Sequence, residues 1–275
     1  MTESAPPAPA AGGGARPIVL GVSFKLYLDV DSTVEWAKTV AEAVRDHPAV
    51  KGGRVRLFVL PSLPAIPGVV DALQGTGVGV GAQDLFWEDR GAFTGAVSGA
   101  DLRTVGCSYA EIGHAERRAL FGEDDVILGR KLVAALRNGL TPVLCVGETV
   151  KSDPQTAARE TAAELEAVTR DLPASDGGHD LIVAYEPRWA IGQAEAADPD
   201  YAGTVIAGLR QVLESDERIG SSSILYGGSA QPGTLSALRE TADGLFLGRF
   251  AHDPRRFGLV LDEALALRDP QLRTG

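Results

Sequence analysis

Short apolar runs alternate along the chain with longer segments that carry apolar residues at helical spacing. The runs of strand length are PIVLGVSF from Pro17, VRLFVLP from Val55, VGVGAQ from Val78, YAEIGH from Tyr109, TPVLCVGE from Thr141, LIVAYEP from Leu181, SILYGG from Ser223 and GLFLGR from Gly244. The segments between them that predict helices are 32–46, 124–137, 156–171, 201–214, 234–241 and 254–267, with starts at Asp31 or Ser32, Asp124, Asp153 and Pro199. This alternation predicts parallel βαβ units.

The strand runs are apolar on both faces, which is typical of a sheet covered by helices on both sides. An open doubly wound sheet usually has a glycine-rich turn after its first strand, but this strand ends in Ser23-Phe24-Lys25. We therefore expect a closed (β/α)8 barrel, class α/β, forming a single domain over residues 17–275. Residues 1–16 are rich in proline, alanine and glycine, which predicts a disordered tail outside the fold.

Composition narrows the range of partners. The chain has 275 residues, a net charge of −11 and a pI near 4.9, which argues against nucleic acid or an anionic membrane as the main partner. No run approaches the roughly 20 apolar residues that span a bilayer, and the N-terminus lacks the apolar core of a signal peptide. The two cysteines, Cys107 and Cys145, do not suggest a disulfide framework, so a cytoplasmic location is expected.

In such barrels the catalytic groups come from the C-terminal ends of the strands. Three of the predicted strands end beside Lys25, His114 and Glu186. A lone lysine is usually a solvated charge, a histidine can be a core residue, and Glu186 could form an ion pair with Arg188. The functional interpretation is an anion-facing ammonium, an imidazole kept neutral by the start of a short helix, and a shielded carboxylate that acts as a base.

The last two strand ends predict a phosphate site. They read YGGSAQPG and GLFLGRFAHDP, and Gly227, Gly228 and Gly248 permit close approach of main-chain N–H groups while Ser229 adds a hydroxyl. Barrels often hold phosphate at these two strands. No metal-ligand cluster and no dinucleotide motif is present, so no metal and no cofactor is expected. The hypothesis is cofactor-free proton transfer on a small phosphorylated molecule.

The motifs EIGHAERR, CVGET, AYEPRWAIG, YGGSAQP and GAFTG resemble the triosephosphate isomerase family, whose fold is the TIM barrel. The resemblance runs in register from about Ile18 to the C-terminal helix. The family is a standard example of a glutamate base working with a neutral histidine beneath a closing loop. It implies an intramolecular oxidoreductase that interconverts aldose and ketose phosphates.

The resemblance also implies residue roles. Glu186 would remove the proton next to the substrate carbonyl, His114 would polarise that carbonyl, Lys25 would offset negative charge and Glu116 would support the site. Substrate and phosphate contacts would come from Ser23, Lys25, Gly192, Ser229, Gly248 and Arg249, and a lid over 187–197 would include Pro187, Trp189, Ile191 and Gly192. Thr94, at the tip of GAFTG, would insert into a second subunit, which implies a homodimer.

Four positions depart from the usual family pattern. Ser23 stands where asparagine is usual, Ala115 replaces a serine, GQAE with Ala194 replaces GTGK in the lid, and Arg249 replaces a glycine. If Ala194 needs a positive φ, it costs roughly 1 kcal/mol relative to glycine. Ser23 and Arg249 resemble a branch that acts on four-carbon ketose phosphates, the L-erythrulose-1-phosphate isomerases. This is the favoured hypothesis. The alternatives are an ordinary glycolytic triosephosphate isomerase and, ranked lower, a non-catalytic sugar-phosphate-binding homologue.

Overall fold

The computed structural model describes residues 16–192 and 196–268, so nearly all of the predicted tail lies outside the described residues. Eight parallel strands close into a barrel in chain order, because the first strand pairs with both the second and the eighth. They are β1 (Ile18–Ser23), β2 (Val55–Leu60), β3 (Gly79–Ala82), β4 (Tyr109–Ile112), β5 (Thr141–Val146), β6 (His179–Tyr185), β7 (Ile219–Tyr226) and β8 (Gly244–Leu247). The predicted closed TIM barrel is confirmed.

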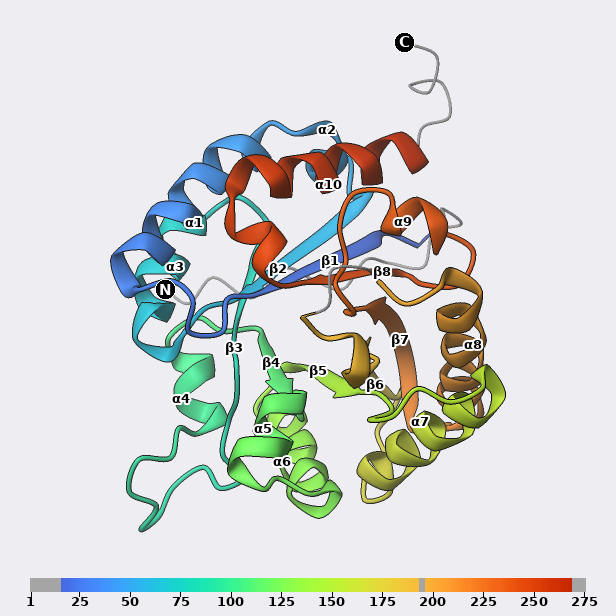
Figure 1. Ribbon diagram of the computed structural model, residues 1–275. Helices are drawn as coiled ribbons and strands as arrows, with labels where there is room; N and C mark the ends of the chain where they lie inside the picture. Colours follow the sequence, from blue (N-terminus) through green and yellow to red (C-terminus); the bar gives the residue numbers. More distant parts are fainter. Residues whose placement is uncertain (1–15, 193–195, 269–275) are drawn as a thin grey trace.

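Helices surround the barrel as an outer ring (Figure 1). The α-helices are α1 (Val30–Arg45), α2 (Pro48–Lys51), α3 (Ile66–Leu73), α4 (Gly99–Thr104), α5 (Ala115–Phe121), α6 (Asp125–Arg137), α7 (Pro154–Thr169), α8 (Pro199–Ser215), α9 (Thr234–Ala237) and α10 (Pro254–Arg268). Three short 3-10 helices are η1 (Leu63–Ala65), η2 (Arg188–Ala190) and η3 (Arg249–His252). No helix in the described ranges is long and apolar enough to cross a membrane.

Aspartate side chains cap the starts of α1, α6, α7 and α8, and two sequence predictions need correction. Helix α1 begins earlier than expected, because the carboxylate of Asp29, and not Asp31 or Ser32, accepts from the Ser32 N–H at 2.7 Å. The predicted helix over 234–241 is only the single turn α9, which follows Gly233 at φ 91° and has no side-chain cap. The predicted caps at Asp124 and Asp153 are confirmed, and Pro199 is the first residue of α8.

The barrel interior is a packed core, distinct from the larger core between strands and helices. Its buried apolar side chains are Val19, Phe58, Leu60, Val143, Cys145, Ile182, Ala184, Leu225 and Phe246. Gly21 makes room for one of them, since a Cβ there would lie 2.2 Å from the Phe58 ring. Cys107 and Cys145 are buried free thiols. This filled interior gives the strand ends a rigid floor, which lets them hold side chains in fixed positions.

Candidate active site

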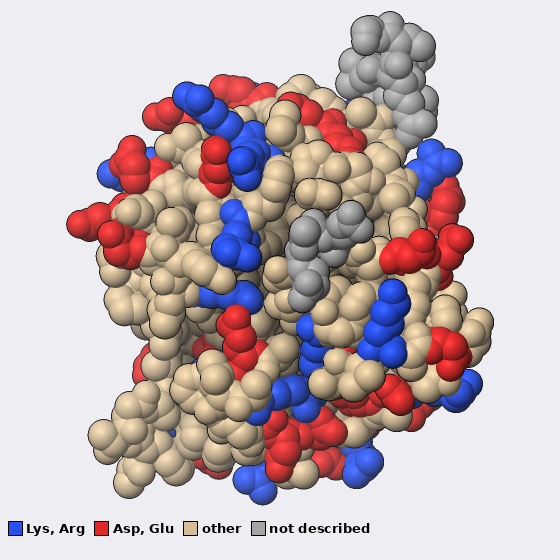
Figure 2. All heavy atoms as spheres, in the orientation of Figure 1, with Lys and Arg blue, Asp and Glu red and all other residues tan. Residues whose placement is uncertain are grey.

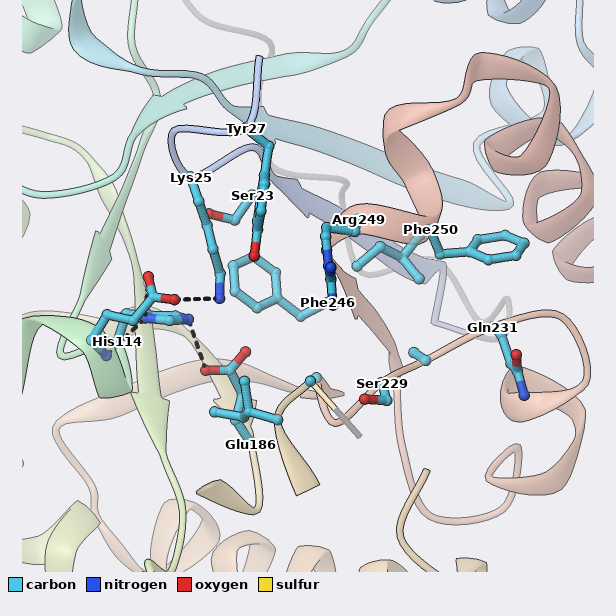
Figure 3. Close-up of a pocket in the computed structure, with 17 residues that line it drawn as sticks. Ser23, Lys25, Tyr27, His114, Glu186, Ser229, Gln231, Phe246, Arg249 and Phe250 are labelled. Atoms are coloured by element: carbon cyan, nitrogen blue, oxygen red, sulfur yellow. Dashed lines mark hydrogen bonds and ion pairs between the residues drawn. The ribbon is translucent and has the colours of Figure 1, made fainter. Parts of the chain in front are cut away.

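A cavity of about 280 Å³ opens at the C-terminal ends of the strands. It brings together the predicted chemical residues, which are Ser23, Lys25, His114, Glu116 and Glu186, and the predicted Ile191, Gly192, Ser229, Gly248 and Arg249 also line it. Figure 3 shows Lys25, His114 and Glu186 converging from three separate strand ends. Residues that are far apart in the chain therefore share one site of a size suited to a small molecule.

Lys25 lies in the turn after β1 with a positive φ of 49°, a conformation that costs a non-glycine residue about 1–3 kcal/mol and is common at functional sites. Its Nζ is 2.9 Å from Glu116 Oε1, and its side chain is 22% exposed. Burial lowers the pKa of Lys25, but the hydrogen bond and charge of Glu116 and the charges of Glu186 and Glu111 outweigh it, and the pKa is raised. The site therefore contains a permanent ammonium group.

His114 follows β4 and caps α5. Its Nδ1 accepts from the Glu116 N–H at 3.1 Å, so in the neutral ring the proton lies on Nε2. Nε2 is 3.6 Å from Glu186 Oε2 (Figure 3). The ring is thus oriented by the main chain, and its N–H is presented to the cavity beside the carboxylate. This orientation suits a hydrogen-bond donor to a carbonyl oxygen.

Glu186 follows β6 directly and is 6% exposed. Its Oε2 is buried and, among the described residues, has no hydrogen-bond partner. The alternative ion pair with Arg188 is not formed, because that guanidinium contacts Glu164 and donates to Thr149 at 3.3 Å. Gly227 leaves room for the carboxylate, since a Cβ there would lie 2.6 Å from Glu186 Cγ. A buried acceptor without a donor is what a proton-abstracting base requires.

The opposite wall comes from β7 and β8. Ser229 has a positive φ of 52°, and with Lys25 it is one of two non-glycine residues in the described ranges with this conformation. Its hydroxyl donates to Ala190 O at 3.1 Å. The guanidinium of Arg249 lies 5.4 Å from the centre of the Tyr27 ring, and both side chains line the cavity. Figure 2 shows basic groups near the centre of this face of an otherwise acidic molecule.

The segment expected to form the lid is attached at both of its described ends. Trp189 Nε1 donates to Glu148 Oε1 at 2.7 Å, and the Ala197 N–H donates to the Tyr226 hydroxyl at 2.8 Å. Pro187 and Trp189 do not line the cavity, whereas Ile191 and Gly192 do. Ala194 lies outside the described residues.

Three residues of this region were missed from the sequence. Glu111 lies inside β4 and accepts a hydrogen bond from Ser23. Glu148 accepts a hydrogen bond from the indole of Trp189, and Tyr27 lines the cavity. A signal existed for Glu111, because a charged residue stands at an alternating position of an apolar strand in YAEIGH. Within the described chain, no group of three or more His, Cys, Asp and Glu side chains is arranged to hold a metal ion.

Thr94 lies away from the cavity. It belongs to a long excursion between β3 and α4, whose residues 91–96 are all exposed and which projects from the barrel in Figure 1. Phe93, beside Thr94, is 43% exposed, and its ring centre lies 4.9 Å from that of Phe86.

Comparison with known proteins agrees with this geometry. The sequence model of the triosephosphate isomerase family matches residues 17–264. The L-erythrulose-1-phosphate isomerase of Pectobacterium atrosepticum is 47% identical over 92% of this chain and 98% of the relative, and that of Rhizobium etli is 38% identical over 84% and 86%. The triosephosphate isomerase of Moorella thermoacetica is 40% identical over 90% and 98%. The chain therefore belongs to the triosephosphate isomerase family and is a phosphosugar isomerase.

Proposed function

We propose that the chain isomerises L-erythrulose 1-phosphate by cofactor-free proton transfer through an enediolate. The observation that carries this proposal is Glu186 Oε2, which has no hydrogen-bond partner within 16–192 and 196–268 and lies 3.6 Å from His114 Nε2 in a cavity that Lys25 also lines. A base, a hydrogen-bond donor and a fixed positive charge are the groups that enolisation of a carbonyl compound needs.

In this mechanism Glu186 removes the proton from the carbon next to the carbonyl and away from the phosphate. Nε2–H of His114 hydrogen-bonds to the carbonyl oxygen, and the ammonium of Lys25 offsets the charge that develops there. His114 then passes a proton to the oxygen on C2 and takes up the proton of the C3 hydroxyl, and Glu186 returns its proton to C2, the former carbonyl carbon. On L-erythrulose 1-phosphate this moves the carbonyl from C2 to C3, so the product is again a ketose. Glu116 contributes by holding Lys25.

The phosphate would be bound by main-chain N–H groups at Gly192, Ser229 and Gly248, together with Arg249. Gly192 and Ser229 line the cavity and have positive φ values, a backbone conformation that occurs in concave groups of N–H donors that bind anions. A guanidinium can add a bidentate contact to phosphate. The segment from Pro187 to Gly192 and its continuation to Ala197 would act as the lid, excluding water from a reactive enediolate phosphate.

The preference for a four-carbon substrate rests on Ser23 and Arg249. A serine is shorter than the asparagine usual in the family and leaves space near the carbon chain. The 47% identity to an L-erythrulose-1-phosphate isomerase, compared with 40% to a triosephosphate isomerase, supports the same choice. Ordinary triosephosphate isomerase is the alternative function.

Steady-state assays on L-erythrulose 1-phosphate and dihydroxyacetone phosphate test the proposal. We expect kcat/KM to favour the four-carbon substrate. A preference of about tenfold, or about 1.4 kcal/mol, for the triose would contradict it and favour the alternative. A non-catalytic binder would bind both compounds and turn over neither.

The assembly is proposed to be a cytoplasmic homodimer in which the exposed excursion around Thr94 docks on a second copy. Exposure of Phe93 and the projection of this segment support the proposal. Sedimentation of a Thr94→Asp variant tests it. We expect a shift from dimer to monomer, and a monomeric wild-type protein would contradict the proposal.

A further inference from the structure

Glu111 is a buried acid directly beneath the active site that the mechanism does not use. It lies in β4 and is 2% exposed. Because side chains alternate along a strand, Glu111 shares the interior face with Tyr109, which stacks on Phe58 at 4.7 Å. Burying a carboxylate among such apolar neighbours costs folding free energy unless hydrogen bonds compensate for the lost water.

Its contacts are few and specific. The Ser23 hydroxyl donates to Glu111 Oε2 at 2.9 Å, and the Cys145 thiol donates to Oε1 at 3.8 Å. No lysine or arginine of the described ranges forms an ion pair with it. Glu111 is therefore connected to the cavity through one side chain, Ser23, which lines the cavity while Glu111 does not.

Charged groups face Glu111 from the strands around it. They are Lys25 after β1, His114 after its own strand and Glu186 after β6, and the Cys145 thiol faces it from β5. Burial raises the pKa of Glu111 to about 7; Glu186 adds to this rise, whereas His114, Ser23 and Lys25 oppose it. Burial also raises the pKa of the Cys145 thiol, which stays protonated.

While Glu111 is ionised it can only accept, so its hydrogen bond fixes the polarity of Ser23. A hydroxyl has one proton, and this one is given to Glu111, so only the lone pairs of Oγ remain for the cavity. Such a group accepts from a hydroxyl but cannot donate to a carbonyl oxygen. Without Glu111 the hydroxyl would rotate and could do either.

We infer that Glu111 is a positioning residue that makes Ser23 a hydrogen-bond acceptor for a hydroxyl group on the carbon chain of the substrate. The inference rests on the proposed function and deepens it. L-Erythrulose 1-phosphate carries an additional hydroxymethyl group that dihydroxyacetone phosphate lacks. The pair of Ser23 and Glu111 therefore contributes more to the four-carbon substrate than to the triose.

A double-mutant cycle tests the inference, with Glu111→Met and Ser23→Ala measured singly and together on both substrates. We expect Glu111→Met to lower kcat/KM about tenfold for L-erythrulose 1-phosphate and by less than about threefold for dihydroxyacetone phosphate. In the Ser23→Ala background the effect of Glu111→Met should disappear. Equal losses on both substrates, or the same loss without the serine hydroxyl, would overturn the inference.

Two further variants serve as a control and as a second test. Cys145→Ala is the matched control, because it removes the contact to the other oxygen of Glu111 without reaching the cavity, and the substrate ratio should not change. Glu111→Gln keeps the side-chain shape if the methionine variant does not fold. It should remove an ionisation near pH 7 from the kcat/KM profile, and an unchanged profile counts against the inference.

Failure of the proposed function can be recognised separately. If the wild-type protein prefers dihydroxyacetone phosphate, the four-carbon assignment fails. The coupling between Glu111 and Ser23 is then read on that substrate, where its presence supports the positioning role and its absence overturns it.

Discussion

Two buried glutamates stand near the ends of neighbouring strands, and their surroundings are opposite. Glu148 follows β5 and is 4% exposed, and it receives hydrogen bonds from Trp189 at 2.7 Å, Tyr201 at 2.8 Å and Tyr185 at 3.2 Å. Glu186 follows β6 and is 6% exposed, yet its Oε2 receives none in the described part of the chain. The two carboxylates are thus equally buried, but the oxygens of Glu148 are hydrogen-bonded and Oε2 of Glu186 is an open acceptor.

The difference separates a structural acid from a reactive one. Burial and the hydrogen bond to Glu148 raise the pKa of Tyr201 to about 12, so this phenol remains a donor near neutral pH. A carboxylate whose oxygens already accept from such donors has little acceptor capacity left for a substrate. An unsatisfied carboxylate destabilises the fold but is available to take a proton.

Glu186→Gln should have the largest effect on catalysis. We expect kcat to fall by about 10³-fold or more, because the amide cannot act as a base. Stability should stay equal or rise, since a buried charge without a donor is removed. Steady-state kinetics and thermal unfolding measure both, with binding of an unreactive sugar-phosphate analogue as the control. Retention of most of the activity would rule out Glu186 as the base.

His114→Asn should have the next largest effect. Asparagine is a good N-cap and preserves the start of α5, but it does not place an N–H where Nε2 lies. We expect kcat to fall about 10²-fold with little change in melting temperature. A loss of stability equal in size to that of a lost cap would instead assign His114 a structural role.

Glu148→Gln should reverse this pattern, with a larger effect on stability than on chemistry. The amide brings N–H donors against the donors of Trp189 and Tyr201, and we expect a loss of about 2 kcal/mol in the free energy of unfolding. Turnover should fall much less than in Glu186→Gln. If the two variants lose activity equally, the contrast between the two acids is wrong.

Glu111 should have a smaller effect on turnover than Glu186 or His114, and it should be visible instead as a pH dependence of stability. Its pKa of about 7 in the folded protein lies above the ordinary 4.5, so the folded state binds more protons between these values. Its contribution therefore falls as pH rises from 4.5 to 7, by an amount on the order of 3 kcal/mol. Glu111→Gln should raise the melting temperature more at pH 8 than at pH 5, and an equal gain at both would contradict this.

The sequence predicted the barrel, because strand runs are local signals. It also placed Lys25, His114 and Glu186 at strand ends, and the structure brings them around one cavity, while their chemical roles stay predictions. It predicted α9 too long and missed α3, since α3 continues from η1 without a side-chain cap. Glu111 was missed for a different reason. Its partner Ser23 is 88 residues away, and only barrel closure brings the two together.

The central claim, that Glu186 transfers the substrate proton, is tested most directly by solvent deuterium incorporation. Substrate incubated in D₂O with the wild-type protein is followed by NMR at the carbon next to the carbonyl, alongside Glu186→Gln. We expect incorporation with the wild-type protein and at least about 10³-fold slower incorporation with the variant. Equal rates for the two proteins would contradict it.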